Sequence, residues 1–280
     1  MTSFYLIGQQ LTIYVGFVLF LVGLIGSVIQ ILIFTSVPRY KNIPSCLYFT
    51  MASINDCGLL ITGLAPYIVT AILNVNINRS SAVWCKLRFF FASIFAAIPL
   101  SFVCLSAIDQ FFITSTSIRL RQWSNMKTAW RLSIGVTIFW WMHGALWFYF
   151  QDLSPITGLC YYVNPKFSIY AILFIFGVLC LFHTSIMITF TILTYRQVQK
   201  SIAITRRRFD RQMITMVCSQ VFLTTVSVTP YGANVIYQSV TIPLLKSDEQ
   251  RAIESLVSVV TYMLNFLTYG VRSIYSFPRY

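Results

Sequence analysis

Apolar residues occur along this chain in long blocks separated by short polar stretches. A soluble protein disperses its apolar residues at helical or alternating spacing, whereas blocks of about 20 residues match helices that cross the ~30 Å hydrocarbon core of a bilayer. The pattern predicts an all-α, integral membrane bundle of seven transmembrane helices. The bundle is expected to form a single domain over residues 1–280, with spans at 11–36, 46–73, 87–114, 129–150, 167–195, 212–240 and 252–276.

The composition excludes a water-soluble globular domain. Hydrophobic residues make up 57% of the chain, charged residues make up 10%, and the mean hydropathy is +0.74. Soluble domains carry about 25% charged residues. Membrane lipid is therefore expected to be the main solvent of the folded chain.

Basic residues are distributed unevenly between the two sets of connections. The connections after spans one, three and five hold twelve Lys and Arg residues and one acid, Asp210, whereas the opposite set holds six cations and four acids. Because cytoplasmic loops carry the excess of Lys and Arg, we expect a plasma-membrane protein with an extracellular N-terminus and a cytoplasmic C-terminus. Topology and anionic inner-leaflet lipid then account for the net charge of +13, and no nucleic-acid partner is expected.

The stretch from Trp84 to Phe112 begins next to a cysteine and ends next to an acid. Along a helix, Cys85 and Asp109 are roughly 36 Å apart, so one is expected at each membrane face. This arrangement resembles the third helix of a rhodopsin-like (class A) G-protein-coupled receptor, and residues 205–231 are similar to invertebrate neuropeptide receptors. The resemblance implies a receptor that binds an extracellular ligand within the helix bundle and signals to a cytosolic heterotrimeric G protein.

Seven cysteines occur in the chain, and two of them, Cys85 and Cys160, lie at the predicted outer face. Oxidation is favoured on that side of the membrane, so we expect a disulfide that tethers the second outer connection to the third helix. Two free thiols are the alternative. The other five cysteines lie within predicted spans, where cysteine packs as a small apolar residue.

Asp56 lies inside the second predicted span, about 15 Å from the inner boundary near Cys46. An acid at this depth is costly unless it is paired, protonated or hydrated, and it therefore indicates a functional site. The receptor resemblance implies an aspartate that binds Na⁺ and helps to couple ligand to effector. A protonated, hydrogen-bonded acid that joins neighbouring helices is the alternative. Apart from this Na⁺, no cofactor or metal site is expected.

The resemblance assigns contact with the G protein to residues at the inner ends of the helices, namely Asp109, Gln110, Arg206, Arg207, Arg208 and Tyr275. Gln110 stands where the family has an arginine, and because glutamine carries no charge, coupling is either altered or absent. Val271 and Arg272 replace an Asn-Pro pair before Tyr275. Arg272 either extends its charge to the inner headgroups or pairs with Asp109 or Asp56. The basic run before span six is alternatively a lipid-facing patch.

Aromatic and charged residues gather at the predicted outer mouth, and the candidate ligand contacts are Phe89, Phe90, Asp152, Tyr161, Tyr237 and Glu254. Such a mouth suits a short amidated or aromatic peptide whose cation meets Asp152 or Glu254. The alternatives are that these aromatics form the usual interfacial belt, or that the ligand is small and odorant-like. Two prolines, Pro66 and Pro230, are expected to kink the second and sixth spans.

Other classes of membrane protein match the sequence less well. A transporter normally contains an internal repeat, and none is visible in the sequence. An enzyme requires clustered catalytic groups, whereas the ionisable residues are scattered and His143 and His183 are isolated in the sequence. We therefore expect no enzymatic activity and treat both histidines as core residues. A receptor-like protein that does not couple to a G protein is retained as the alternative function.

Overall fold

The computed structural model describes residues 2–74, 81–154, 160–200, 208–241 and 246–275. This part of the chain is 91% helical, which confirms the all-α prediction. The short exception is an antiparallel pair of strands, β1 (Gln151–Leu153) and β2 (Cys160–Tyr162).

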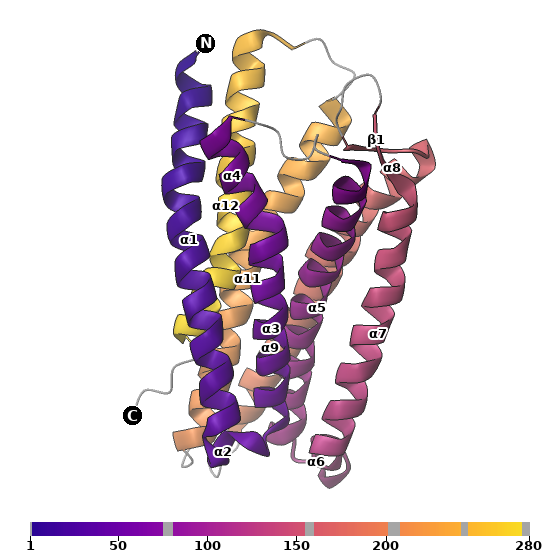
Figure 1. The fold of residues 1–280 in the computed structure, drawn as a ribbon. Helices are drawn as coiled ribbons and strands as arrows, with labels where there is room; N and C mark the ends of the chain where they lie inside the picture. Colours follow the sequence, from indigo (N-terminus) through magenta and orange to yellow (C-terminus); the bar gives the residue numbers. More distant parts are fainter. Residues whose placement is uncertain (1, 75–80, 155–159, 201–207, 242–245, 276–280) are drawn as a thin grey trace.

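Long helical segments run side by side through the molecule (Figure 1). In chain order they are α1 (Thr2–Ser36), α3 (Pro44–Leu59) with η1 (Leu60–Leu64) and α4 (Ala65–Leu73), α5 (Ala82–Thr114), α7 (Met126–Phe150), α8 (Pro165–Leu173) with η3 (Phe174–Phe182) and α9 (His183–Lys200), α11 (Arg208–Thr241) and α12 (Asp248–Tyr275). Two short helices, α2 (Pro38–Lys41) and α6 (Ile118–Trp123), lie at the end of the bundle opposite β1.

Within the described residues, five helical segments are long and apolar enough to cross a membrane. They are Phe4–Ser36, Pro44–Leu73, Ala82–Thr114, Pro165–Gln199 and Asp248–Tyr269. By length and composition the chain is therefore a multi-pass membrane protein. The predicted spans at 129–150 and 212–240 fall in α7 and α11, which are not among these five segments.

Large apolar side chains cover much of the outer surface of the bundle. Tyr14 on α1, Met142 on α7 and Phe222 on α11 are 70%, 72% and 72% exposed. A water-soluble protein seldom presents contiguous apolar surface of this kind. The outward-facing residues are instead suited to contact with lipid tails.

Several helices begin at a residue whose side chain accepts a hydrogen bond from a main-chain N–H group, or at a proline, which has no N–H group. Side-chain oxygens of Ser81, Asn125 and Asn164 accept hydrogen bonds from main-chain N–H groups in the first turns of α5, α7 and α8. Proline opens α3 and α8, at Pro44 and Pro165, where a missing N–H costs no helical hydrogen bond. These local signals define helix starts independently of the tertiary packing.

The helix α5 lies between α3 and α7 in the view of Figure 1, and it contacts α3, α7 and α9. Ile98 and Phe102 near its middle are fully buried. The α7 helix approaches α5 closely at Gly144, where an added Cβ would lie 2.6 Å from Ile94. α5 therefore packs against helices on several sides and forms part of the core of the bundle.

Helical geometry is interrupted in two of the apolar rods. The π-helical segment η1 lies just before Pro66, and the longer π-helical segment η3 leads directly into His183. Such segments widen the helix locally and are frequent at functional sites. Pro230 lies inside α11, which continues beyond it to Thr241.

Candidate ligand cavity and Asp109 hydrogen-bond network

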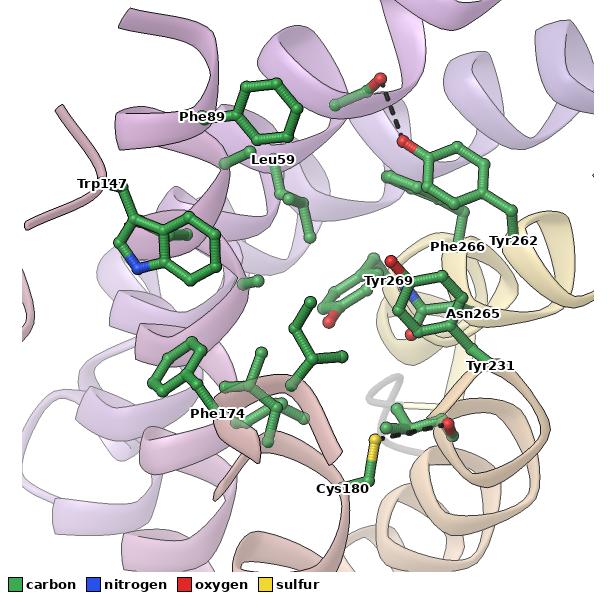
Figure 2. A pocket seen from close by; sticks show the side chains of 18 of the residues that line it. Leu59, Phe89, Trp147, Phe174, Cys180, Tyr231, Tyr262, Asn265, Phe266 and Tyr269 are labelled. Carbon is green, nitrogen blue, oxygen red and sulfur yellow. Dashed lines mark hydrogen bonds between the residues drawn. The ribbon is translucent and has the colours of Figure 1, made fainter. Parts of the chain in front are cut away.

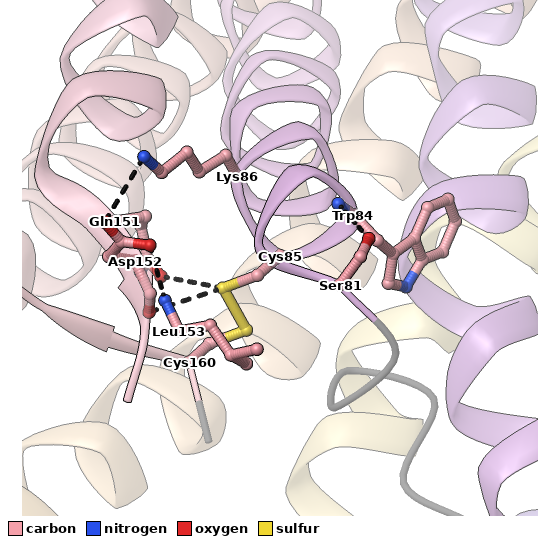
Figure 3. The surroundings of a disulfide bond; sticks show 8 residues. All are labelled: Ser81, Trp84, Cys85, Lys86, Gln151, Asp152, Leu153 and Cys160. Carbon is pink, nitrogen blue, oxygen red and sulfur yellow. Dashed lines mark hydrogen bonds and ion pairs between the residues drawn. A yellow bond between two sulfur atoms is a disulfide. The ribbon is translucent and has the colours of Figure 1, made fainter. Parts of the chain in front are cut away.

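A disulfide joins Cys85, in the first turn of α5, to Cys160 of β2, with the two Cα atoms 6.0 Å apart (Figure 3). This bond confirms the sequence prediction. Residues 151–153 pair with residues 160–162, so the bond ties this hairpin to the start of α5. One end of α5 is therefore covalently anchored.

Asp152 of the hairpin is engaged by groups close to the disulfide. Its carboxylate lies 3.4 Å from Nζ of Lys86 and accepts a hydrogen bond of 2.8 Å from the main-chain N–H of Leu153 (Figure 3). The hydrogen bond from Leu153, together with Lys86, lowers the pKa of Asp152. Both partners favour the charged carboxylate at this position.

A cavity of about 300 Å³ lies between α5, η3, α11 and α12, in the half of the bundle nearer the disulfide. Figure 2 shows Phe89 and Trp147 on one side of this space and Tyr231, Asn265 and Tyr262 on the other. The described lining comprises Leu59, Gly63, Tyr67, Arg88, Phe89, Ala92, Ser93, Ala96, Leu100, Trp147, Tyr162, Phe174, Ile175, Leu179, Cys180, Val228, Tyr231, Tyr262, Asn265, Phe266 and Tyr269. An apolar cavity with a few polar groups is the usual form of a small-molecule site.

Arg88 is the residue with a formal charge among the described lining residues. Tyr67 and Tyr262 belong to the same lining. The Tyr262 hydroxyl donates to the carbonyl oxygen of Gly63 at 3.3 Å, and the rings of Tyr67 and Tyr262 lie 4.8 Å apart. Burial raises the pKa of Tyr162 to about 12, so this lining phenol is neutral at physiological pH. The cavity thus has one polar wall with positive charge.

Two adjacent phenylalanines take different positions. Phe89 lines the cavity, whereas Phe90 packs edge-on against Trp141 and Phe148, with ring centroids 5.8 and 6.2 Å away. Tyr161 is exposed on β2 and is not among the lining residues. Its neighbour Tyr162, which sequence analysis did not select, is among them.

Tyr237 and Glu254 form a separate cluster with Lys246 near the ends of α11 and α12. The Tyr237 hydroxyl donates to Oε1 of Glu254 at 3.0 Å, and Nζ of Lys246 lies 2.6 Å from Oε2 of the same carboxylate. The Lys246 ammonium is also 5.5 Å from the Tyr237 ring centroid. None of the three residues is among those that line the cavity. Both acids proposed to receive a ligand cation thus have a lysine as partner.

Asp56 is buried in α3, with 1% of its surface exposed. It lies one helical turn before Leu59, which lines the cavity. The two interpretations from sequence, a Na⁺ site and a hydrogen-bonded acid between helices, both require this burial. The role of Asp56 in sodium binding stays a prediction.

Asp109 and Gln110 belong to a buried hydrogen-bond network at the other end of α5. The Asp109 carboxyl accepts hydrogen bonds from Ser45 of α3 at 2.5 Å and from Ser124, between α6 and α7, at 2.6 Å. Nε2 of Gln110 donates to Oγ of Ser45 at 2.9 Å. This network connects α3, α5 and the segment that leads into α7. Sequence analysis missed both serines because it looked for a charged partner of Asp109.

Other residues assigned to the inner face lie beyond what the structure describes. Arg206 and Arg207 fall outside the described residues, and the side chains of Arg208, Arg272 and Tyr275 are likewise not described. The proposed G-protein contacts of these residues therefore stay predictions. The same holds for a pair between Arg272 and either Asp109 or Asp56.

The middle of the bundle contains a serine–histidine contact that the sequence did not indicate. Oγ of Ser101 lies 3.0 Å from Nε2 of His183, and Trp140 donates to the same Oγ at 2.8 Å. Nδ1 of His183 lies 2.7 Å from the carbonyl oxygen of Val178, so Nδ1 carries the proton, and the Ser101 hydroxyl can donate either to Nε2 or to the Ala97 carbonyl oxygen, which is also 3.0 Å away. A Ser–His pair can activate a nucleophile, but both side chains are buried and neither lines the cavity. The contact joins α5, α7 and α9 as part of the core.

Comparison with known proteins provides no family for this chain. No family model matches it, and no curated protein matches it. The cavity, the disulfide and the network around Asp109 are therefore the features that bear on function.

Proposed function

We propose that the chain is a seven-span receptor of the rhodopsin-like type. It binds an extracellular ligand in the cavity beside Arg88 and signals to a cytosolic heterotrimeric G protein. The observation that carries this proposal is that α5 lines the cavity at one end and holds the Asp109 network at the other. Arg88 and Asp109 are about 30 Å apart along the helix, which is close to the thickness of a bilayer core.

The count of seven spans requires α7 and α11 to cross the membrane as well. α7 is rich in tryptophan, which a hydropathy scale ranks as weakly polar although its ring is suited to lipid contact. Phe139 and Met142 are 59% and 72% exposed on this helix, and Phe222 is 72% exposed on α11. Side chains of this kind directed away from the bundle support lipid contact for both helices.

The orientation of the proposed receptor has the hairpin outside the cell. Disulfides persist in oxidising compartments, and the Cys85–Cys160 bond lies at the end of the bundle opposite α2 and α6. The basic residues Arg119 and Arg121 belong to α6, which supports a cytoplasmic position for that end. This arrangement corresponds to an extracellular N-terminus in the plasma membrane.

Coupling between the two ends is proposed to run through α5. A ligand in the cavity contacts α5 together with η3, α11 and α12, so it favours one relative position of these helices over another. A displaced α5 stretches the bonds of Asp109 to Ser45 and Ser124, which lie on other segments. We propose that this serine network restrains the resting receptor in place of the arginine ion pairs that Gln110 cannot form.

Two measurements test the proposal. Epitope tags at the two termini are expected to be accessible on opposite sides of the plasma membrane, and tags on the same side would refute the seven-span topology. In cells that express a promiscuous G protein, ligand addition is expected to dissociate the G-protein subunits. Normal surface expression with silence to peptides, odorants and small acids would favour the alternative, a receptor-like protein that does not couple.

A further inference from the structure

We propose that the cavity binds a small amphipathic carboxylate whose negative head contacts Arg88 and whose apolar body lies between the aromatic side chains. This inference names the ligand class of the site and rests on the proposed ligand-binding role of the cavity. It differs from the cationic or amidated peptide that the sequence favours, because it assigns the ligand the opposite charge.

The charge of the cavity wall is the first support. Arg88 lies in the lining of the cavity together with the phenols Tyr67 and Tyr262 and supplies a positive charge there. A guanidinium forms two parallel hydrogen bonds with a carboxylate, which makes the pair stronger and more directional than a bond to a neutral oxygen. The surrounding apolar surface excludes water and strengthens this attraction.

The positions of the acidic residues are the second support. Asp152 and Glu254 lie outside the cavity, and each is within ion-pairing distance of a lysine, Lys86 or Lys246. Arg88 would therefore repel a ligand cation in the cavity, and the described lining residues include no carboxylate to attract it. Aromatic faces attract cations as well, so the sign of the preferred head group depends on Arg88.

The size of the cavity is the third support. A cavity of about 300 Å³ lies at the small end of the range of roughly 300–1,000 Å³ that ligand pockets span. This matches one aromatic ring with a short acidic arm more closely than a peptide of several residues. Phe89, Trp147 and Phe174 provide flat apolar walls for such a ring.

The test uses three probes that share a phenylpropyl skeleton and differ in the head group: 3-phenylpropanoate, 3-phenylpropanamide and 3-phenylpropylamine. Binding to the full chain in lipid nanodiscs is measured by ligand-observed NMR, with empty nanodiscs as the blank. The acid is expected to bind with a dissociation constant on the order of a millimolar, as is typical of fragments of this size. The amide is expected to bind more weakly, and the amine most weakly.

Two variants connect this preference to Arg88. Arg88→Gln is expected to weaken acid binding by about 10- to 100-fold and to leave amide binding nearly unchanged, because the lost interaction is a charged hydrogen bond. Lys86→Gln is the matched control, since it removes the same charge two positions earlier on α5, outside the cavity. Its acid affinity is expected to equal that of the wild type. Unfolding midpoints of both variants establish that the bundle is intact.

Several outcomes overturn the inference. They are an amine that binds better than the acid, equal loss of acid and amide binding in folded Arg88→Gln, or failure of the acid to bind the folded wild type. The assay contains no G protein, so it separates ligand class from signalling. Acid binding without G-protein activation by any ligand would refute the proposed coupling while leaving the ligand class supported. Activation by a cationic ligand would support the proposed coupling and refute the proposed ligand class.

Discussion

The substitution Ser45→Ala tests whether the network at the Asp109 end of α5 restrains the protein. Oγ of Ser45 donates to Asp109 and accepts from Gln110, so one atom links both residues to α3. Removing it leaves Asp109 with Ser124 and removes the described acceptor of the Gln110 amide. Ser45 is fully buried, and Asp109 and Gln110 are 5% and 3% exposed, so water does not readily replace the lost partner.

The expected magnitude follows from this burial. A buried polar group that loses its partner costs about 1–3 kcal/mol, and two such groups are affected here. If the network is specific to the resting arrangement, a loss of that size shifts the balance between resting and active forms by roughly 5- to 150-fold. We therefore expect higher ligand-independent signalling and a lower free energy of unfolding.

Ser53→Ala is the matched control for this variant. Ser53 lies on the same helix and is also fully buried, but its hydroxyl donates to the Phe49 carbonyl oxygen within α3. Its loss removes no described contact between helices. Basal activity is measured as G-protein subunit dissociation in living cells, normalised to surface expression, and stability is measured on purified protein in nanodiscs.

Two results would refute the reasoning about Ser45. If Ser45→Ala matches Ser53→Ala in both assays, the network contributes nothing specific to the resting state. If Ser45→Ala lowers stability but leaves basal signalling at the wild-type level, the network holds the fold together without controlling activity.

Three further predictions concern the rest of the molecule. Cys160→Ser opens a loop whose ends are 75 residues apart. The chain-entropy relation predicts that this lowers the free energy of unfolding by about 4 kcal/mol. Adding a reductant should cause the same loss in the wild type and no further loss in the variant. Because the pKa of Asp152 is lowered from 3.8, its contribution to the hairpin is present above that value and is lost as pH falls through the lowered pKa. The protection factor of the Leu153 amide, which is its exchange rate corrected for the intrinsic pH dependence, should therefore fall at acid pH in the wild type, and a fall of the same size in Asp152→Asn would contradict this. Trp140→Phe removes the donor to Ser101 and should reduce stability by about 1–2 kcal/mol in chemical unfolding, with no change implying that the hydrogen bond contributes nothing.

Helix positions and the disulfide were accessible from sequence because their causes are local or topological. A chain in lipid must satisfy its backbone hydrogen bonds within each segment, so long apolar blocks become helices irrespective of their neighbours. Caps at Ser81, Asn125 and Asn164 set helix starts in the same local way. The pairing of Cys85 with Cys160 followed from the side of the membrane on which both residues were expected.

The tertiary structure decided which residues line the cavity. Consecutive residues on a helix point about 100° apart, so Phe89 faces the cavity while Phe90 packs against α7. Only the rotation of α5 within the bundle determines which of the two is exposed to a ligand. Asp152 and Glu254 are attractive ligand contacts as isolated acids, but folding places a lysine beside each of them.

The sequence by itself therefore determined that the chain folds in lipid, which segments are helical, and which types of residue lie near the ends of the helices. What only the tertiary structure decided is which side chains meet, as in the serines around Asp109 and the arginine on the cavity wall. The physical reason is that helix formation in a membrane depends on the composition of one segment. Contacts between helices depend instead on the rotation, depth and packing of several segments at once.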